Sequence, residues 1–207
     1  MNLRRCGRLT TTAEAAVWYR AVEPQHWRTL LQTSQTMASP SRFNGGPFAH
    51  PPFEILYLAE DLQVALFEVE ALVGPPGRPG GVLAQPRLAW TLINIRVQLQ
   101  RVADLTVVAT QNLLATTAQE LTGDWEGYQL RSRRTSISEP IGLAPTQELG
   151  AALYSLPDLE GFRTLSAKVP YAMHLVVFPQ KLQPGSRVEF SHPTLGTHSI
   201  LGPAALP

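Results

Sequence analysis

Two glutamates that follow a tyrosine are the side chains of this sequence best suited to chemistry. The stretch ILYLAEDLQVALFEVEAL, residues 55–72, passes from an extended run containing Tyr57 into a predicted helix that carries Glu68 and Glu70. A carboxylate at the margin of a core can stabilise a developing positive charge, and a nearby tyrosine can stack or donate a hydrogen bond. Helical glutamates are more often solvated, so residue type alone leaves both acids open.

The helix that carries these acids is predicted over residues 61–72. Asp61 can cap its first turn. Apolar residues at helical spacing form one stripe: Leu62, Ala65, Leu66, Val69, Leu72 and Val73. Glu68 and Glu70 fall on opposite flanks of this stripe, so each is expected at the margin of the core. Periodicity therefore does not choose between them.

The rest of the chain predicts a mixed set of elements. Strands are predicted at 16–22, 53–59, 88–99, 162–167, 174–178 and 186–190, and helices at 61–72, about 110–121 and about 146–155, the last capped by Thr146. Strands cluster late without a regular strand–helix–strand rhythm, which favours an α+β fold with a mixed or antiparallel sheet and flanking helices. The Pro- and Gly-rich stretch 73–87 is expected to be a surface loop, and the tail 191–207 is expected to pack or fray without a catalytic role.

Composition narrows the class of protein. The 207 residues, 44% hydrophobic and 16% charged, predict a single globular domain over 1–207. A net charge of +1 gives no general attraction for nucleic acid, and the basic run RSRRTS at 131–136 is interpreted as a solvated loop, so direct nucleic-acid binding is not expected. The single cysteine, Cys6, excludes an internal disulfide. Because apolar runs are short, we expect a cytoplasmic protein that does not enter a membrane.

Established binding motifs are missing from the sequence. The five histidines show no spacing typical of a zinc site, so no metal is expected. Neither FNGGPF nor GPPGRPGG has the strand–turn–helix setting of a glycine-rich phosphate loop. A dinucleotide, if bound, would therefore be held without a Rossmann motif.

Several short motifs occur in an order that resembles the RES domain family. They are WYRA (18–21), RFN (42–44), ILYLAEDLQVALFEVEA (55–71), LSAK (165–168) and HLVVF (174–178), and the resemblance covers about residues 18–178. That family comprises the toxins of RES–Xre toxin–antitoxin pairs. The resemblance implies a fold similar to the ADP-ribosyltransferase toxins and an enzyme that breaks the nicotinamide–ribose bond of NAD by hydrolysis or phosphorolysis. Protein ADP-ribosylation and a non-catalytic partner-binding module remain alternatives.

The resemblance also assigns roles to individual residues. The family's acid falls on Glu68, its serine on Ser166 and its strand tyrosine on Tyr57, while its arginine is Arg20 or Arg42, both retained with a preference for Arg42. The arginines would bind the pyrophosphate, Tyr57 the nicotinamide or ribose, and Ser166 a ribose hydroxyl or Glu68 itself. NAD would be a substrate rather than a tightly bound cofactor, with inorganic phosphate as one candidate co-substrate. An Xre-type antitoxin is the implied partner, and a homo-oligomer is left open.

Overall fold

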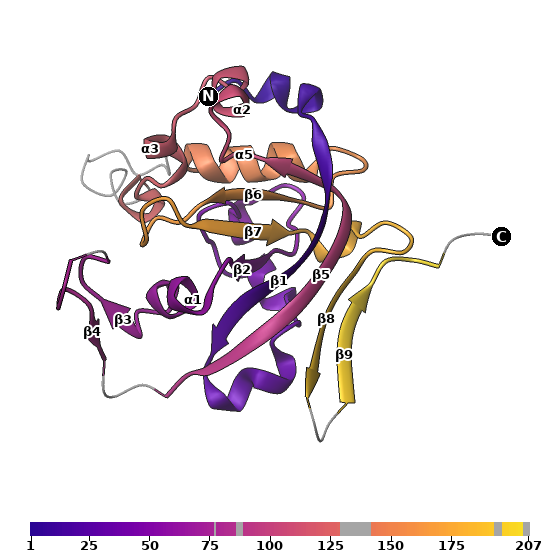
Figure 1. Ribbon diagram of the computed structural model, residues 1–207. Helices are drawn as coiled ribbons and strands as arrows, with labels where there is room; N and C mark the ends of the chain where they lie inside the picture. The colour runs from indigo at the N-terminus through magenta and orange to yellow at the C-terminus, as the bar shows by residue number, and fades with distance from the viewer. Residues whose placement is uncertain (77, 86–88, 129–141, 193–195, 205–207) are drawn as a thin grey trace.

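The computed structural model describes residues 1–76, 78–85, 89–128, 142–192 and 196–204. A seven-stranded sheet with strand order β1-β2-β7-β6-β5-β8-β9 dominates the fold (Figure 1). The strands are β1 (Thr11–Val22), β2 (Leu56–Ala59), β5 (Thr91–Asp104), β6 (Gly161–Leu165), β7 (Met173–Val177), β8 (Arg187–His192) and β9 (Gly196–Leu201). The sheet is mixed, because β5 and β6 pair in parallel while its other pairings are antiparallel.

The sheet closes on itself through the two longest strands. β1 pairs with β5 from Thr11 opposite Ala103 to Val22 opposite Thr91, and Figure 1 shows these strands curving side by side. The β8–β9 hairpin extends from the middle of β5. Strand alternation then separates two cores. Leu56 and Leu58 of β2 join a cluster with Trp18, whereas Tyr57 between them packs against a cluster that contains residues of α5.

Helices and short 3-10 turns surround the sheet. The helices are α1 (Leu62–Glu68), α2 (Val108–Leu113), α3 (Ala118–Leu121) and α5 (Pro145–Tyr154), and the 3-10 turns are η1 (Leu3–Arg8), η2 (Pro24–Thr29), η3 (Ser34–Met37), η4 (Gly46–Phe48) and η5 (Pro179–Lys181). Within the predicted loop 73–87, β4 (Leu83–Ala84) pairs with β3 (Leu72–Val73) to form a second, small sheet. Along the parts of the chain that the structure describes, every helix is too short or too polar to cross a lipid bilayer.

The predicted helix 61–72 is wrong at its C-terminal end. α1 stops at Glu68, and Glu70 adopts a left-handed conformation with φ 58°. The amide of Ala71 then donates to the carbonyl of Leu66 at 2.9 Å, a closing bond typical of a helix C-terminus. The buried residues of α1 are Val64, Ala65 and Phe67, so the predicted apolar stripe was displaced.

Other predicted boundaries also shift. The helix expected at 110–121 is two helices, because Ala115 takes φ 50° and Thr117 starts α3 by accepting a hydrogen bond from the amide of Glu120 at 3.1 Å. The strand expected at 88–99 starts at Thr91 and runs on to Asp104. The strand expected at 53–59 is confined to β2, and that at 162–167 ends at Leu165.

Two further expectations concern the C-terminal half. α5 begins with Ala144 at its N-cap in place of Thr146, and the side chain of Gln147 accepts a hydrogen bond from the Ala144 amide at 3.0 Å. The tail predicted over 191–207 contains part of β8 and all of β9, so it packs as an edge hairpin. The basic run 131–136 lies outside the described residues.

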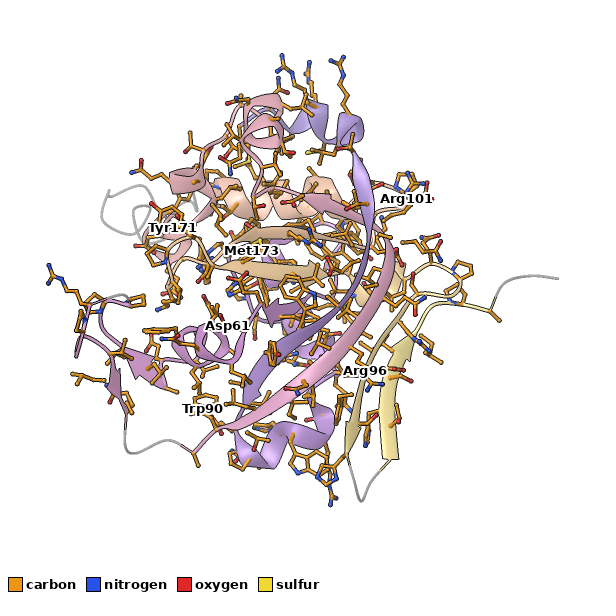
Figure 2. The ribbon with its side chains drawn as sticks, viewed as in Figure 1. Asp61, Trp90, Arg96, Arg101, Tyr171 and Met173 are labelled. Atoms are coloured by element: carbon orange, nitrogen blue, oxygen red, sulfur yellow. The ribbon has the colours of Figure 1, made fainter. Side chains whose placement is uncertain are left out.

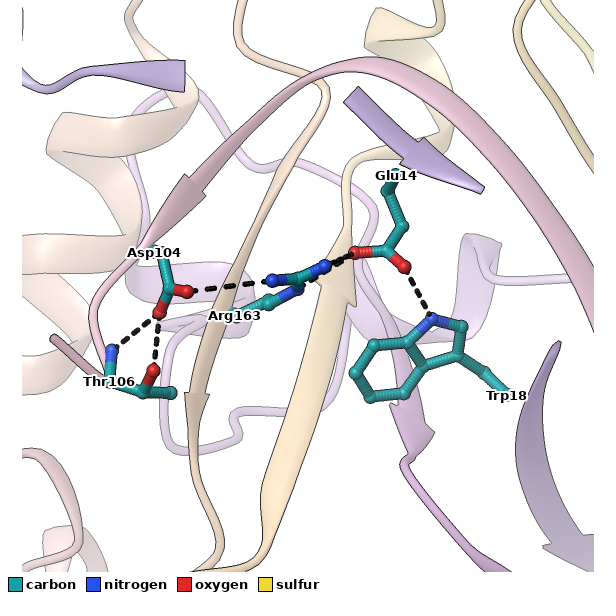
Figure 3. Close-up of polar contacts among 5 residues, drawn as sticks. All are labelled: Glu14, Trp18, Asp104, Thr106 and Arg163. Atoms are coloured by element: carbon teal, nitrogen blue, oxygen red, sulfur yellow. Dashed lines mark hydrogen bonds and ion pairs between the residues drawn. The ribbon is translucent and has the colours of Figure 1, made fainter. Parts of the chain in front are cut away.

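An ionic network links β6 to β1 and β5 (Figure 3). Arg163 on β6 donates from Nε to Oε2 of Glu14 at 2.7 Å, and its Nη1 lies 3.5 Å from Oδ2 of Asp104. Glu14 is only 3% exposed and also accepts a hydrogen bond from Trp18. A carboxylate buried to this degree destabilises the fold unless it is paired. Arg163 therefore holds the strand that ends one residue before Ser166.

Candidate active site

The carboxylate of Glu68 is oriented by the turn between β6 and β7. Ser166 Oγ donates to Glu68 Oε1 at 2.7 Å and accepts from the amides of Lys168 at 3.1 Å and Val169 at 3.0 Å. Because two amide hydrogens point at the hydroxyl oxygen, its own hydrogen is directed to the carboxylate. Ser166 is buried, whereas the Glu68 side chain retains 27% exposure. The site thus offers a fixed carboxylate that solvent can still reach.

The start of α1 and its small buried residues bring Glu68 to this turn. Asp61 caps the helix by accepting a hydrogen bond from the Val64 amide at 2.7 Å. Val64 and Ala65 pack with three alanines of the neighbouring elements: Ala21, Ala59 and Ala172. The amide of Glu60 donates to the carbonyl of Met173 at 3.1 Å, and Asp61 and Met173 lie on the same side of the molecule in Figure 2. Short side chains therefore let α1 lie close to β1, β2 and the turn before β7.

Tyr57 contacts the residues on both sides of Arg42. Its phenol oxygen accepts from the amide of Phe43 at 3.0 Å and lies 2.9 Å from Oγ of Ser41. Burial raises the pKa of Tyr57, so the phenol stays protonated at neutral pH. The role suggested for Tyr57 by its position is therefore to fix the conformation of the loop that carries Arg42.

The loop of residues 41–44 is further fixed from α5. Gln147 donates to the carbonyl of Ser41 at 2.9 Å. The buried side chain of Asn44 donates to two backbone carbonyls, at 3.0 and 2.9 Å. Gly150 lies directly against Phe43, since a Cβ atom there would approach the Phe43 carbonyl oxygen to 1.8 Å. Arg42 is thus carried by a rigid loop, although the Arg42 Nε atom is buried with no hydrogen-bond partner among the described residues.

His174 is a member of this group that the sequence analysis did not select. Its Nε2 lies 3.3 Å from Glu68 Oε1, within ion-pair distance, yet its geometry does not form a hydrogen bond with any described residue. Burial lowers the pKa of His174, Glu68 acts to raise it, and Arg42 acts to lower it further. The only sequence signal was one histidine at the start of the apolar run HLVVF.

Four of the five expected site residues lie close together. Glu68 and Ser166 are hydrogen-bonded, and the charges of Arg42 and Glu68 both act on the pKa of Tyr57, after the larger effect of burial. Glu70 does not join them. It is exposed at the surface, where Lys168 Nζ lies 2.9 Å from its Oε1 and lowers the pKa of its carboxyl.

Arg20 lies apart from these four residues. Tyr19 and Ala21 on either side of it pack toward Ala59 and α1, so strand alternation turns Arg20 to the opposite face of β1. There its Nη1 donates to the carbonyl of Leu30 at 2.7 Å. Burial lowers the pKa of Arg20 to about 10, which still leaves it charged at neutral pH. No carboxylate forms an ion pair with it among the described residues.

Comparison with known proteins identifies the family. A family model described as RES domain matches residues 17–195. The chain belongs to the RES domain family. A chain in the crystal structure of the M. tuberculosis MbcT–MbcA toxin–antitoxin complex is similar with a TM-score of 0.63 and 21% identity, over 96% of this chain and 91% of that chain. No curated protein sequence matches. The structural similarity confirms the expected α+β fold.

Replacing Tyr57 by Phe tests the loop-holding role. The change removes the acceptor of the buried Phe43 amide, and we expect the free energy of unfolding in urea to fall by ~1–3 kcal/mol. Amide hydrogen exchange at Phe43 should accelerate as well. Tyr154→Phe is the matched control, because that hydroxyl bonds Gln180 at the surface and its loss should cost under ~0.5 kcal/mol. Equal stability of the two variants would contradict this role for Tyr57.

Proposed function

We propose that this RES-family protein is a toxin that cleaves the nicotinamide–ribose bond of NAD, with water or inorganic phosphate as the acceptor. The observation that supports this most is the carboxylate of Glu68, which Ser166 fixes through one oxygen while the side chain stays partly exposed. It lies near the charge of Arg42 without an ion pair between them among the described residues. A carboxylate and a guanidinium that do not neutralise each other can act on opposite charges of one ligand.

The chemistry of NAD cleavage suits this pair. Nicotinamide is attached through a positively charged ring nitrogen, so it leaves as a neutral molecule and requires no general acid. As the bond stretches, positive charge develops on the ribose, as in glycoside hydrolysis. A fixed carboxylate beside the ribose stabilises that charge without reorganising during the reaction. Glu68 would supply this stabilisation, and Ser166 would hold it in position.

The arginines would bind the pyrophosphate. A guanidinium donates two parallel hydrogen bonds to phosphate oxygens, and an Arg42 with an unpaired Nε has a donor available for them. Arg42 shares the surroundings of Tyr57 and His174, which supports the preference for it over Arg20. Arg20 remains a second candidate, because it is a partly buried cation without a carboxylate partner among the described residues.

Glu68→Gln should lower NAD cleavage by a factor on the order of a hundred or more, because the amide keeps the shape of the side chain and removes its charge. Folding should be nearly unchanged. The measurement is release of nicotinamide by the purified protein, with and without inorganic phosphate, which also identifies the acceptor.

Glu70→Gln is the matched control for this variant, since Glu70 is exposed and, among the described residues, pairs only with Lys168. Its rate should equal that of the unchanged protein. Equal loss in both variants, or no loss in Glu68→Gln, would remove Glu68 from the reaction. Radiolabel that passes from NAD to protein would instead identify a protein ADP-ribosyltransferase.

Arg42→Lys keeps the positive charge but loses the forked donor, so productive NAD binding should weaken by ~1–3 kcal/mol. Steady-state kinetics should show this as a raised KM with a smaller change in kcat. Arg20→Lys is measured beside it, and we expect the smaller effect there. An Arg42→Lys protein with unchanged NAD kinetics would exclude Arg42 from the substrate site.

We further propose that an antitoxin of the Xre type restrains the enzyme by covering the site. The similar M. tuberculosis chain comes from a toxin–antitoxin complex, which supports a partner of this kind. Expression of the protein alone should deplete cellular NAD and arrest growth, and co-expression with an Xre-type antitoxin from the same genome should restore both. The Glu68→Gln protein should be harmless yet still bind the antitoxin, because an isosteric change barely alters the covered surface. Growth arrest by Glu68→Gln at constant NAD would contradict the proposal.

A further inference from the structure

The two oxygens of the Glu68 carboxylate have different surroundings. Oε1 accepts the hydrogen bond of Ser166 at 2.7 Å and lies 3.3 Å from His174 Nε2. Within the described parts of the chain, Oε2 makes neither a hydrogen bond nor an ion pair. One oxygen therefore accepts a hydrogen bond from Ser166 and lies beside His174, and the other is available to a ligand.

His174 reaches Oε1 from the centre of the sheet. It lies on β7, opposite Ala59 of β2 and Thr164 of β6, and is 4% exposed. Alternation places Tyr57, two residues before Ala59, on the same face. Ser166 likewise follows Thr164 by two residues. His174 and Ser166 therefore approach Oε1 of Glu68 from the face of the sheet that α1 covers.

The charged and titratable groups that face His174 come from three elements. Glu68 lies at the end of α1, Arg42 on the loop before β2, and Tyr57 on β2 itself. Burial and Arg42 lower the pKa of His174 while Glu68 raises it, and the balance leaves it below the ordinary value of 6.5. Tyr57 is a neutral phenol at this pH, since burial raises its pKa. At neutral pH the imidazole is therefore uncharged and does not offset the charge of the Glu68 carboxylate.

We propose that His174 is a positioning residue of this site: Ser166 holds Oε1 of Glu68 by a hydrogen bond, the neutral imidazole lies beside that oxygen, Oε2 faces the ribose, and protonation of the imidazole switches the site off. This inference rests on the proposed NAD cleavage. An imidazolium at 3.3 Å from Oε1 would bring the net charge of the histidine–carboxylate pair from −1 to zero. The negative charge that stabilises the developing ribose cation would then be cancelled by the neighbouring imidazolium.

The first test is the pH dependence of NAD cleavage, measured between about pH 4.5 and pH 8. For the unchanged protein, kcat/KM should fall in acid with a midpoint at the pKa of His174 obtained from NMR of its ring. His174→Gln keeps a neutral polar side chain that cannot ionise. This variant should lack the acid limb, while its rate at pH 7.5 falls less than about tenfold.

Two controls separate this effect from others. His26→Gln replaces a surface histidine and should keep the acid limb and the rate. Ser166→Ala removes the other contact of Oε1 and should lower the rate at every pH with the acid limb in place. Because a histidine held neutral in the fold lowers stability as pH falls below about 6.5, circular dichroism at each pH must show folded protein. An unchanged acid limb in His174→Gln would overturn the inference.

A second measurement does not depend on activity. In the NMR titration of the unchanged protein, His174 should titrate below pH 6.5, and in Glu68→Gln it should titrate lower still, because the negative charge that raises its pKa has been removed. An identical titration in both proteins would overturn the proposed coupling, even if His174→Gln fails to fold. Absence of NAD cleavage at every pH would instead contradict the proposed function, and this titration would still test the contact.

Discussion

The hydrogen bond from Ser166 to Glu68 joins segments that are 98 residues apart, and much of the fold is needed to form it. β2 leads directly into α1, and β7 follows the turn that contains Ser166. Because β2 and β7 pair antiparallel, the last residue of β2 lies beside the start of β7. The end of α1 and the turn before β7 therefore meet at the same end of these two strands. Arg163 in turn links β6 to a buried glutamate on β1 and a partly exposed aspartate on β5. The carboxylate is therefore positioned by strand pairing rather than by local helix structure.

The position of Arg42 depends on a separate set of contacts. Tyr57 lies in the middle of β2 and holds the amide of Phe43, while α5 packs against the same loop through Gly150 and Gln147. β2 thus helps to position both charged groups. Its Tyr57 holds the loop that carries Arg42, and its C-terminal end leads into α1, which carries Glu68. The arrangement keeps opposite charges at fixed positions without letting them form a pair, which would otherwise neutralise both.

The sequence predicted the order of the principal elements because hydrophobic alternation and helical periodicity are local properties. The choice between Glu68 and Glu70 was not local. The helix ends at Glu68, and the left-handed backbone at Glu70 follows from a closing hydrogen bond that periodicity does not reveal. Only the family resemblance chose Glu68. Likewise, the separation of Arg20 from Tyr57 depends on which face each strand presents after β1 and β2 have paired.

His174 is a residue of this region that local sequence patterns did not reveal. A lone histidine in an apolar strand is usually a satisfied core residue, and nothing near it in sequence carries charge. Glu68 and Arg42 lie near His174 only because β7 pairs with β2, which connects the loop of Arg42 to the helix of Glu68. Three buried polar atoms without a hydrogen-bond partner among the described residues then occur in this one region: Arg42 Nε, Thr164 Oγ1 and His174 Nε2. Such atoms destabilise a fold, and native proteins keep few of them. Their concentration around Glu68 is understandable if the region was selected for a ligand and for control of one carboxylate rather than for stability.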